Sequence, residues 1–157
     1  MKFILPVLLA IAFSINCSAQ QPSVGSSVPD VKLHDVNGKT VNLSSLKGKV
    51  VVLDFWASWC GPCRRSMPAI KEIYKKYKDK GLEVYAVSVD TDKDAWLKAI
   101  KDDATTWVHV IDDNNAVAKA WQVAYIPNTY LIDKTGKVIS VNPNHAALEQ
   151  QIGKLLN

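Results

Sequence analysis

The sequence is poor in cysteine and histidine, since its 157 residues contain only three of each. A structural zinc site needs four ligands at suitable spacing. His34, His109 and His145 are too far apart to form a His-x₃₋₅-His pattern, and there is no second pair of cysteines. We therefore expect no metal site. So few cysteines also exclude the disulfide framework of a small secreted scaffold.

Long apolar runs, internal repeats and low-complexity tracts are missing too. The apolar stretch from Phe3 to Phe13, interrupted by Pro6, is far shorter than the ~20 residues of a membrane-spanning helix. A net charge of +4 on scattered basic residues does not indicate nucleic-acid binding. The length suits one domain with one core.

The first residues have the features of a secretory signal. Lys2 is a short basic region, Phe3–Phe13 is the apolar region, and Cys17-Ser18-Ala19 is a small-residue cleavage pattern. This predicts a signal peptide over residues 1–19, a domain over residues 20–157, and export to a bacterial periplasm. A retained anchor and lipidation at Cys17 are the alternatives, although the three residues before Cys17 match a lipoprotein signal poorly.

One stretch organises the rest of the chain. Val50–Trp56 is nearly all apolar, which predicts a strand buried on both faces. Gly61–Tyr77 has helical periodicity, so Cys60 and Cys63 lie where the strand leads into a helix N-terminus. Peptide dipoles there favour a thiolate, the nucleophilic form of cysteine. A disulfide closing so small a loop adds little stability, which favours redox chemistry over a structural role.

Strand and helix patterns alternate along the remaining sequence. Two alternating segments, Val31–His34 and Thr40–Leu43, predict a β-hairpin with a two-residue turn at Asn37-Gly38. Further strands are expected at 82–89, 107–111, 129–132 and 137–141, and further helices at 92–102, 112–121 and from Asn144 onward. This order predicts an α/β fold whose sheet contains parallel strands and is covered on both faces.

Two motifs resemble one family. Asp54-Phe55-Trp56-Ala57-Ser58-Trp59-Cys60-Gly61-Pro62-Cys63 and the run from Ile126 to Lys137 are similar to the thioredoxin superfamily, and most similar to its exported TlpA/ResA-like subgroup. The resemblance implies a thioredoxin-like fold with a central mixed sheet flanked by helices. It also implies an N-terminal β-hairpin, a central helix–strand insertion at about Asp92–Ile111, and thiol–disulfide exchange.

Three residues are candidates for catalysis. Cys60, at the helix start, is expected to be the more exposed cysteine and to attack the partner's disulfide. Cys63, one turn further on, is expected to resolve the mixed disulfide. Asp54 matches the buried acid of thioredoxins, and burial among apolar neighbours should raise its pKa into the range useful for moving protons to and from Cys63.

Five residues are candidates for substrate binding. Pro127 matches the family's cis-proline, which leaves the backbone of Ile126 free to pair with a substrate strand. Trp59 is a candidate apolar platform beside the cysteines. Gly61 and Pro62, between the cysteines, complete this substrate face.

The sequence departs from the subgroup in its proton-carrying groups. Ser66 stands where many members carry a glutamate, and Ala86 stands near the position of the thioredoxin lysine. Asp54 would therefore act alone or with water. Peroxiredoxins are excluded, because Ala57 and Leu53 replace the threonine and proline that precede their peroxidatic cysteine.

The expected function is that of a disulfide reductase, since the Gly61-Pro62 pair matches thioredoxin, whose potential is about −270 mV. We expect no cofactor beyond the Cys60–Cys63 disulfide. We also expect a monomer that is reduced by a membrane thiol donor and acts on proteins such as apocytochrome c. One alternative is a copper metallochaperone that uses Cys60, Cys63 and His145. The other is a binding module with vestigial cysteines.

Overall fold

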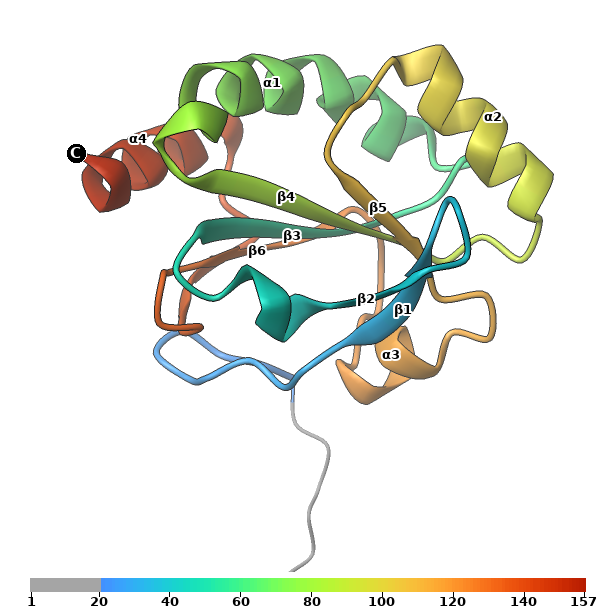
Figure 1. Ribbon diagram of the computed structural model, residues 1–157, viewed down its shortest axis with the longest axis horizontal. Coiled ribbons are helices and arrows are strands. Elements are labelled where there is room, and N and C mark those ends of the chain that lie inside the picture. The colour runs from blue at the N-terminus through green and yellow to red at the C-terminus, as the bar shows by residue number, and fades with distance from the viewer. Residues whose placement is uncertain (1–20) are drawn as a thin grey trace, which may run out of the picture.

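The computed structural model describes residues 21–157 (Figure 1). The predicted signal peptide and Cys17 lie outside the described residues. The strands are β1 (Lys32–Asp35), β2 (Thr40–Asn42), β3 (Val50–Trp56), β4 (Leu82–Ser88), β5 (Val108–Ile111), β6 (Asn128–Ile132) and β7 (Val138–Val141). The helices are α1 (Gly61–Tyr77), α2 (Lys93–Asp103), α3 (Ala116–Ala120) and α4 (His145–Leu156), with 3₁₀ turns η1 (Leu43–Leu46) and η2 (Lys78–Lys80).

The strands form one mixed sheet in the order β2-β1-β5-β4-β3-β6-β7. The neighbours β3, β4 and β5 run parallel, as helical crossovers require, and the hairpins at both edges add antiparallel strands. The N-terminal hairpin and the α2–β5 insertion are both present, so the expected fold class is confirmed. No helix within residues 21–157 is both long enough and apolar enough to cross a bilayer.

Helices lie on both faces of the sheet. In Figure 1, α1, α2 and α4 lie on one side and α3 lies on the other. Alternate residues of β3 belong to two separate apolar clusters. Val50, Val52 and Trp56 pack with Cys63 of α1, while Val51, Leu53 and Phe55 pack against the opposite layer. By this alternation Asp54 points into the layer that holds Cys63.

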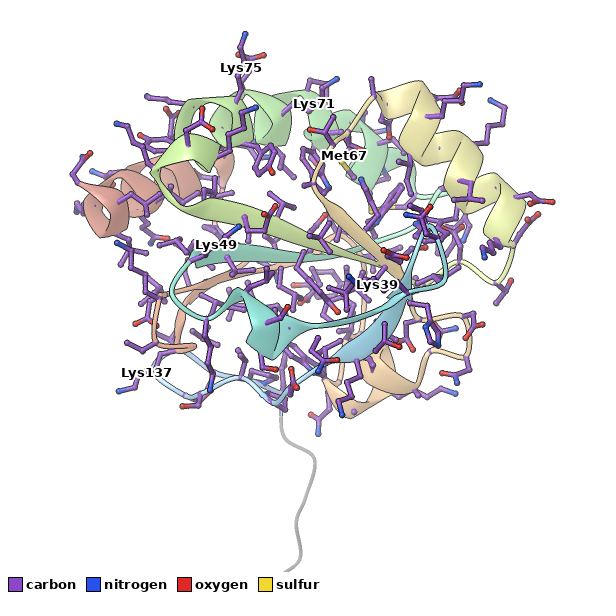
Figure 2. The ribbon with its side chains drawn as sticks, viewed as in Figure 1. Lys39, Lys49, Met67, Lys71, Lys75 and Lys137 are labelled. Carbon is purple, nitrogen blue, oxygen red and sulfur yellow. A yellow bond between two sulfur atoms is a disulfide. The ribbon has the colours of Figure 1, made fainter. Side chains whose placement is uncertain are left out.

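β3 occupies the predicted range and α1 begins at the predicted Gly61, because their patterns are long and regular. The α-helix ends at Tyr77, and the 3₁₀ turn η2 continues the chain to Gly81. Every residue of β3 is buried. In α1, Met67 lies on the side that faces the sheet, and Lys75 projects away from it (Figure 2). Pro68 lies inside the helix, which continues through it to Tyr77.

The prediction of a two-residue hairpin turn is wrong. The turn closes on the bond from the Asp35 N–H to the Lys39 carbonyl, which leaves a loop of three residues. The Asp35 carboxylate accepts bonds from the backbone N–H groups of Asn37 and Lys39, and this favours the longer loop. Gly38 takes the left-handed conformation that such a loop requires, at φ +79°.

Candidate active site

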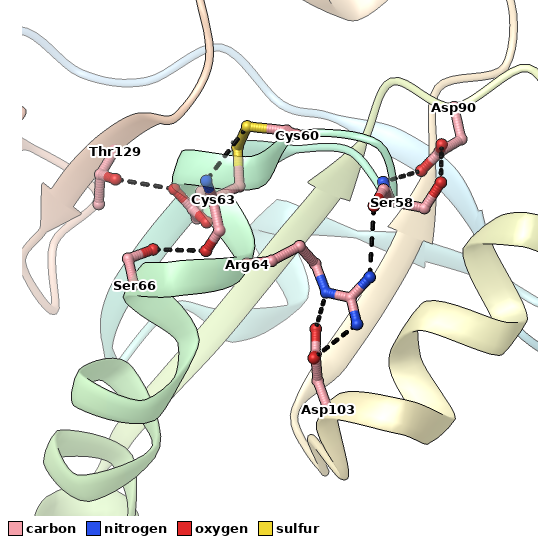
Figure 3. The surroundings of a disulfide bond; sticks show 9 residues. Ser58, Cys60, Cys63, Arg64, Ser66, Asp90, Asp103 and Thr129 are labelled. Atoms are coloured by element: carbon pink, nitrogen blue, oxygen red, sulfur yellow. Dashed lines mark hydrogen bonds and ion pairs between the residues drawn. A yellow bond between two sulfur atoms is a disulfide. The ribbon is translucent and has the colours of Figure 1, made fainter.

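The two cysteines predicted to carry the chemistry form a disulfide at the start of α1 (Figure 3). Cys60 caps the helix in an extended conformation, and the Cys63 N–H donates to its sulfur over 3.2 Å. The sulfur therefore lies where unpaired N–H groups and the helix dipole stabilise negative charge. This position favours Cys60 as the thiolate once the disulfide is reduced.

Cys60 is more exposed than Cys63, as predicted, but the difference between the two is small. Cys63 is fully buried, and Cys60 is 5% exposed. Trp59, immediately before Cys60, is 68% exposed, while Trp56 is buried in the core. In this oxidised state an approaching partner meets the Trp59 ring and only a small part of Cys60.

Asp54 is a buried acid, as the resemblance implies. Its side chain is 2% exposed, and this burial raises its pKa to about 7. The Thr129 hydroxyl donates to its Oδ1 over 2.7 Å and opposes the increase. Ala86 of the neighbouring strand β4 is paired with Asp54, so no lysine is available at that position. A group with a pKa near neutrality can take up and release a proton under physiological conditions.

Ser66, which stands in place of the subgroup's glutamate, is used by the helix itself. Its hydroxyl donates to the Cys63 carbonyl over 2.7 Å (Figure 3). A serine hydroxyl has no acid–base activity near neutral pH. Neither Ser66 nor Ala86 therefore provides a second titratable group beside Asp54.

A groove lies beside Trp59, the residue before Cys60. The Ile126–Pro127 peptide bond is cis, as the resemblance implies, and it leads directly into β6. Ile126 and Trp59 line the same groove of about 440 Å³, with Tyr125 exposed at its side. The other lining residues are Val89, Thr91, Asn115, Ala118, Val123 and Ala124. Gly61 and Pro62 are exposed in the first turn of α1.

Behind the active-site turn lies a polar network that the sequence analysis did not identify. Asp90 is buried and accepts from the backbone N–H of Ser58 at 2.8 Å, from its hydroxyl at 2.6 Å and from the Ser88 hydroxyl at 2.7 Å. Arg64 donates to the Ser58 carbonyl at 3.3 Å and forms an ion pair with Asp103 (Figure 3). Ser58 is thus bonded at its N–H, its hydroxyl and its carbonyl.

A weak signal for this network was present in the sequence. Asp90 directly follows the run Leu82–Val89, which is apolar apart from Glu83 and Ser88, and a polar residue at such a place is commonly buried with its partners. The hydrogen bonds of Ser58, Arg64 and Thr129 had no comparable signal in the sequence. Ser58 and Asp90 are 32 residues apart, and Thr129 and Asp54 are 75 residues apart.

The histidines do not join the cysteines. His145 begins α4 and lines a groove with Ala69, Ile73 and Lys76 of α1, beyond the first turn that holds Cys63. The His109 ring contacts Trp56 and Trp107 in the core, and burial lowers its pKa to about 4. Within residues 21–157, no cluster of His, Cys, Asp or Glu could hold a metal ion. This arrangement does not favour the copper-binding alternative.

Comparisons with known sequences identify relatives of one kind. The family model named Redoxin matches residues 23–152. The thiol–disulfide oxidoreductase ResA of Bacillus subtilis is 40% identical over 119 residues, which are 76% of this chain and 66% of that protein. ResA of Geobacillus kaustophilus is also 40% identical, over 139 residues that cover 86% of this chain and 80% of the relative.

Comparisons with solved structures agree. The thioredoxin domain of a thiol–disulfide oxidoreductase from Bacteroides vulgatus superposes with a TM-score of 0.81 and 31% identity, covering 86% of this chain and 99% of that domain. A DsbE-type thiol:disulfide interchange protein from Chlorobium tepidum gives a TM-score of 0.81 and 36% identity, covering 87% of this chain and all of that one.

Proposed function

The chain belongs to the Redoxin family, as a thioredoxin-fold protein of the ResA type, and on this premise we propose that it is an exported protein-disulfide reductase. Thiol–disulfide exchange is the activity named for its relatives. The observation that carries the proposal is the position of the Cys60–Cys63 disulfide, at a helix N-terminus next to Trp59, which lines an open groove.

The proposed cycle begins with the reduced pair. The Cys60 thiolate attacks one sulfur of the substrate disulfide, forming a mixed disulfide and releasing the other substrate sulfur as a thiolate. Cys63 then loses its proton to Asp54, and its thiolate attacks the Cys60 sulfur. This forms the Cys60–Cys63 disulfide and releases the second substrate sulfur as a thiolate. The two substrate thiolates take up one proton released by Asp54 and one from solvent, so the substrate gains two electrons and two protons. The pair needs no further cofactor.

The direction of the cycle is proposed from the residues between the cysteines. Gly61-Pro62 is the pair found in thioredoxin, a reductant with a potential of about −270 mV, and not in strong oxidants near −120 mV. The Cys63 N–H lies against the Cys60 sulfur, which supports a stabilised thiolate.

The groove supports a protein substrate. Its walls are mainly apolar or aromatic, with Thr91 and Asn115 as polar members, and the exposed Trp59 and Tyr125 suit a polypeptide better than a small charged thiol. The cis peptide bond beside it leaves the backbone at Ile126 available to an extended segment. We propose that apocytochrome c is one client, and that a membrane thiol donor returns the electrons to a monomeric protein after export through residues 1–19.

An assay of disulfide reduction tests the activity. Wild-type protein should reduce insulin with dithiothreitol as the electron source, whereas Cys60→Ser should be inactive. Cys63→Ser should accumulate a mixed disulfide with the substrate, because the resolving thiol is missing. The assay uses the mature chain expected after cleavage, residues 20–157, in which Cys60 and Cys63 are the only cysteines. Equal turnover by all three proteins would disprove the assignment of the pair.

The direction is tested separately by the midpoint potential of the pair in glutathione buffers. A reductase should have a potential well below that of the strong oxidants. A value more positive than about −170 mV would contradict the reductase proposal and leave the exchange activity intact.

A further inference from the structure

We propose that Thr129 is the positioning residue of Asp54: its hydroxyl holds Oδ1 of the carboxylate, so that Oδ2 exchanges the proton with Cys63. This inference rests on the proposed function, because it concerns the step in which Cys63 is deprotonated. It also explains how the site works without the glutamate and lysine that Ser66 and Ala86 replace.

The geometry begins with strand register. Asp54 of β3 is paired with Thr129 of β6, so both side chains lie on the same face of the sheet. The Thr129 hydroxyl donates to Asp54 Oδ1 over 2.7 Å, a short bond of the kind that an ionised acceptor makes. A buried carboxylate at this place cannot use water freely, so the bond fixes its orientation.

Thr129 is itself held firmly by Asn142, which follows β7. The Thr129 N–H donates to Asn142 Oδ1 over 2.7 Å, and the Asn142 N–H donates to the Thr129 carbonyl over 2.7 Å. Asn142 adopts φ +50°, a conformation that asparagine tolerates better than most residues. Its side-chain amide also donates to the hydroxyl of Tyr125, beside the groove. The hydroxyl that holds Asp54 is therefore attached to a rigid backbone, linked to the substrate face.

Among the described residues on this side of the sheet, Thr129 is the one that orients the Asp54 carboxylate. From β4 the neighbour is Ala86, and α4 contributes the apolar Leu148 to the same cluster. The titratable groups are Cys63 from α1 and His109 from β5, and burial keeps His109 neutral above about pH 4. The described residues provide no cation to stabilise the charge of Asp54; the causes of its pKa shift are burial and the Thr129 bond.

A hydrogen bond to the charged form of an acid lowers its pKa, so losing the bond should raise the pKa of Asp54 further. At a pH below this pKa, less of the carboxylate is then ionised and able to accept the Cys63 proton. Resolution of the mixed disulfide should slow on the acid side and reach the same rate on the alkaline side. A residue with a merely structural role would change the rate at every pH.

The test compares Thr129→Val, which loses only the hydroxyl, with Thr129→Ser, which keeps it. The rate of mixed-disulfide resolution is measured by rapid mixing with a disulfide-bonded peptide between pH 5 and 9. We expect the midpoint of the profile to rise by about one pH unit in Thr129→Val and to stay at the wild-type value in Thr129→Ser. At pH 6 this corresponds to a loss of roughly tenfold.

A second measurement keeps the inference testable if Thr129→Val is poorly folded. The Asp54 carboxyl carbon is labelled with ¹³C and titrated by NMR in wild type, Thr129→Ser and Thr129→Ala. The same upward shift of the titration midpoint is expected only in Thr129→Ala. Equal midpoints in every Thr129 variant, together with a midpoint that disappears in Asp54→Asn, would overturn the inference and leave the proposed function standing. Failure of wild type to exchange disulfides would instead remove the proposed function.

Discussion

Arg64 of α1 and Asp103, the last residue of α2, form an ion pair with 2.5 Å between Nε and Oδ2. A second guanidinium nitrogen donates to Asp103 Oδ1 over 2.7 Å, so the ion pair includes one hydrogen bond. Lys71 also donates to the Asp103 carbonyl over 2.8 Å. The same Arg64 reaches the Ser58 carbonyl, so the inserted helix is connected to the turn before Cys60.

The first prediction concerns this pair. A double-mutant cycle of Arg64→Ala and Asp103→Ala should give a coupling free energy of about 1 kcal/mol, because the side chains are only 28% and 16% exposed and a hydrogen bond accompanies the ion pair. Urea unfolding measures it. The cycle of Lys98→Ala and Asp102→Ala, an exposed pair within α2, is the control and should give a clearly smaller coupling, because solvent screens the pair. Equal couplings would contradict the inferred connection.

The second prediction concerns Asp90. Its replacement by alanine leaves the N–H and hydroxyl of Ser58 without their acceptor in a buried setting, so we expect a loss of about 3 kcal/mol in the free energy of unfolding. Ser88→Ala removes the bond that its hydroxyl donates to Asp90 and the bond that it accepts from the Asp90 N–H, but it keeps both Ser58 bonds, so it should cost about 2 kcal/mol. Chemical denaturation of the oxidised proteins measures both. A cost for Asp90→Ala no larger than that for Ser88→Ala would show that Asp90 does not hold the turn.

The third prediction concerns the groove. Trp59→Ala should raise the KM for insulin several-fold while leaving the rate with a small aromatic disulfide unchanged, because only a polypeptide is large enough to use the groove wall. Stability should change little, since the ring is 68% exposed. Val24→Ala removes an apolar side chain that is 65% exposed and does not line the groove, and it is the matched control. An equal loss with both substrates would assign Trp59 to the chemistry of Cys60.

Regular apolar patterns explain what the sequence predicted well. The strand Val50–Trp56 and the start of the helix at Gly61 were placed to the residue, because a run buried on both faces and a helical stripe leave few other solutions. The cysteine pair followed from spacing and from its position between these elements. The cis bond before Pro127 agrees with the family resemblance, and no local sequence pattern would have predicted it.

The polar connections could not be predicted, because they join residues far apart in the chain. Thr129 and Asp54 are 75 residues apart, and whether their side chains meet depends on the register of β3 and β6. Asp103 and Asn142 stand at element ends, where polar residues usually indicate a cap or a turn. The hairpin turn failed for a related reason: the Asp35 side chain adds two bonds that a turn dipeptide does not reveal.

The last prediction concerns two buried groups whose effects on stability oppose each other. The pKa of Asp54 rises from 3.8 to about 7 on folding, so the folded state binds a proton more tightly than the unfolded chain. Its contribution makes the protein less stable as the pH rises from about 4 to 7, by up to about 4 kcal/mol. The pKa of His109 falls from 6.5 to about 4, so its contribution makes the protein more stable over nearly the same range, by about 3 kcal/mol.

The two dependences should nearly cancel in the wild type and become visible when either group is removed. Oxidised Asp54→Asn should gain stability relative to wild type at pH 7.5 and gain almost none at pH 4, because a neutral side chain avoids the cost of a buried charge. His109→Gln should do the reverse, with its advantage over wild type confined to the acid side. Urea unfolding at the two pH values measures all three proteins. If Asp54→Asn keeps the same free-energy difference from wild type at both pH values, the carboxyl does not titrate near neutrality, and its role as the proton acceptor of Cys63 fails with it.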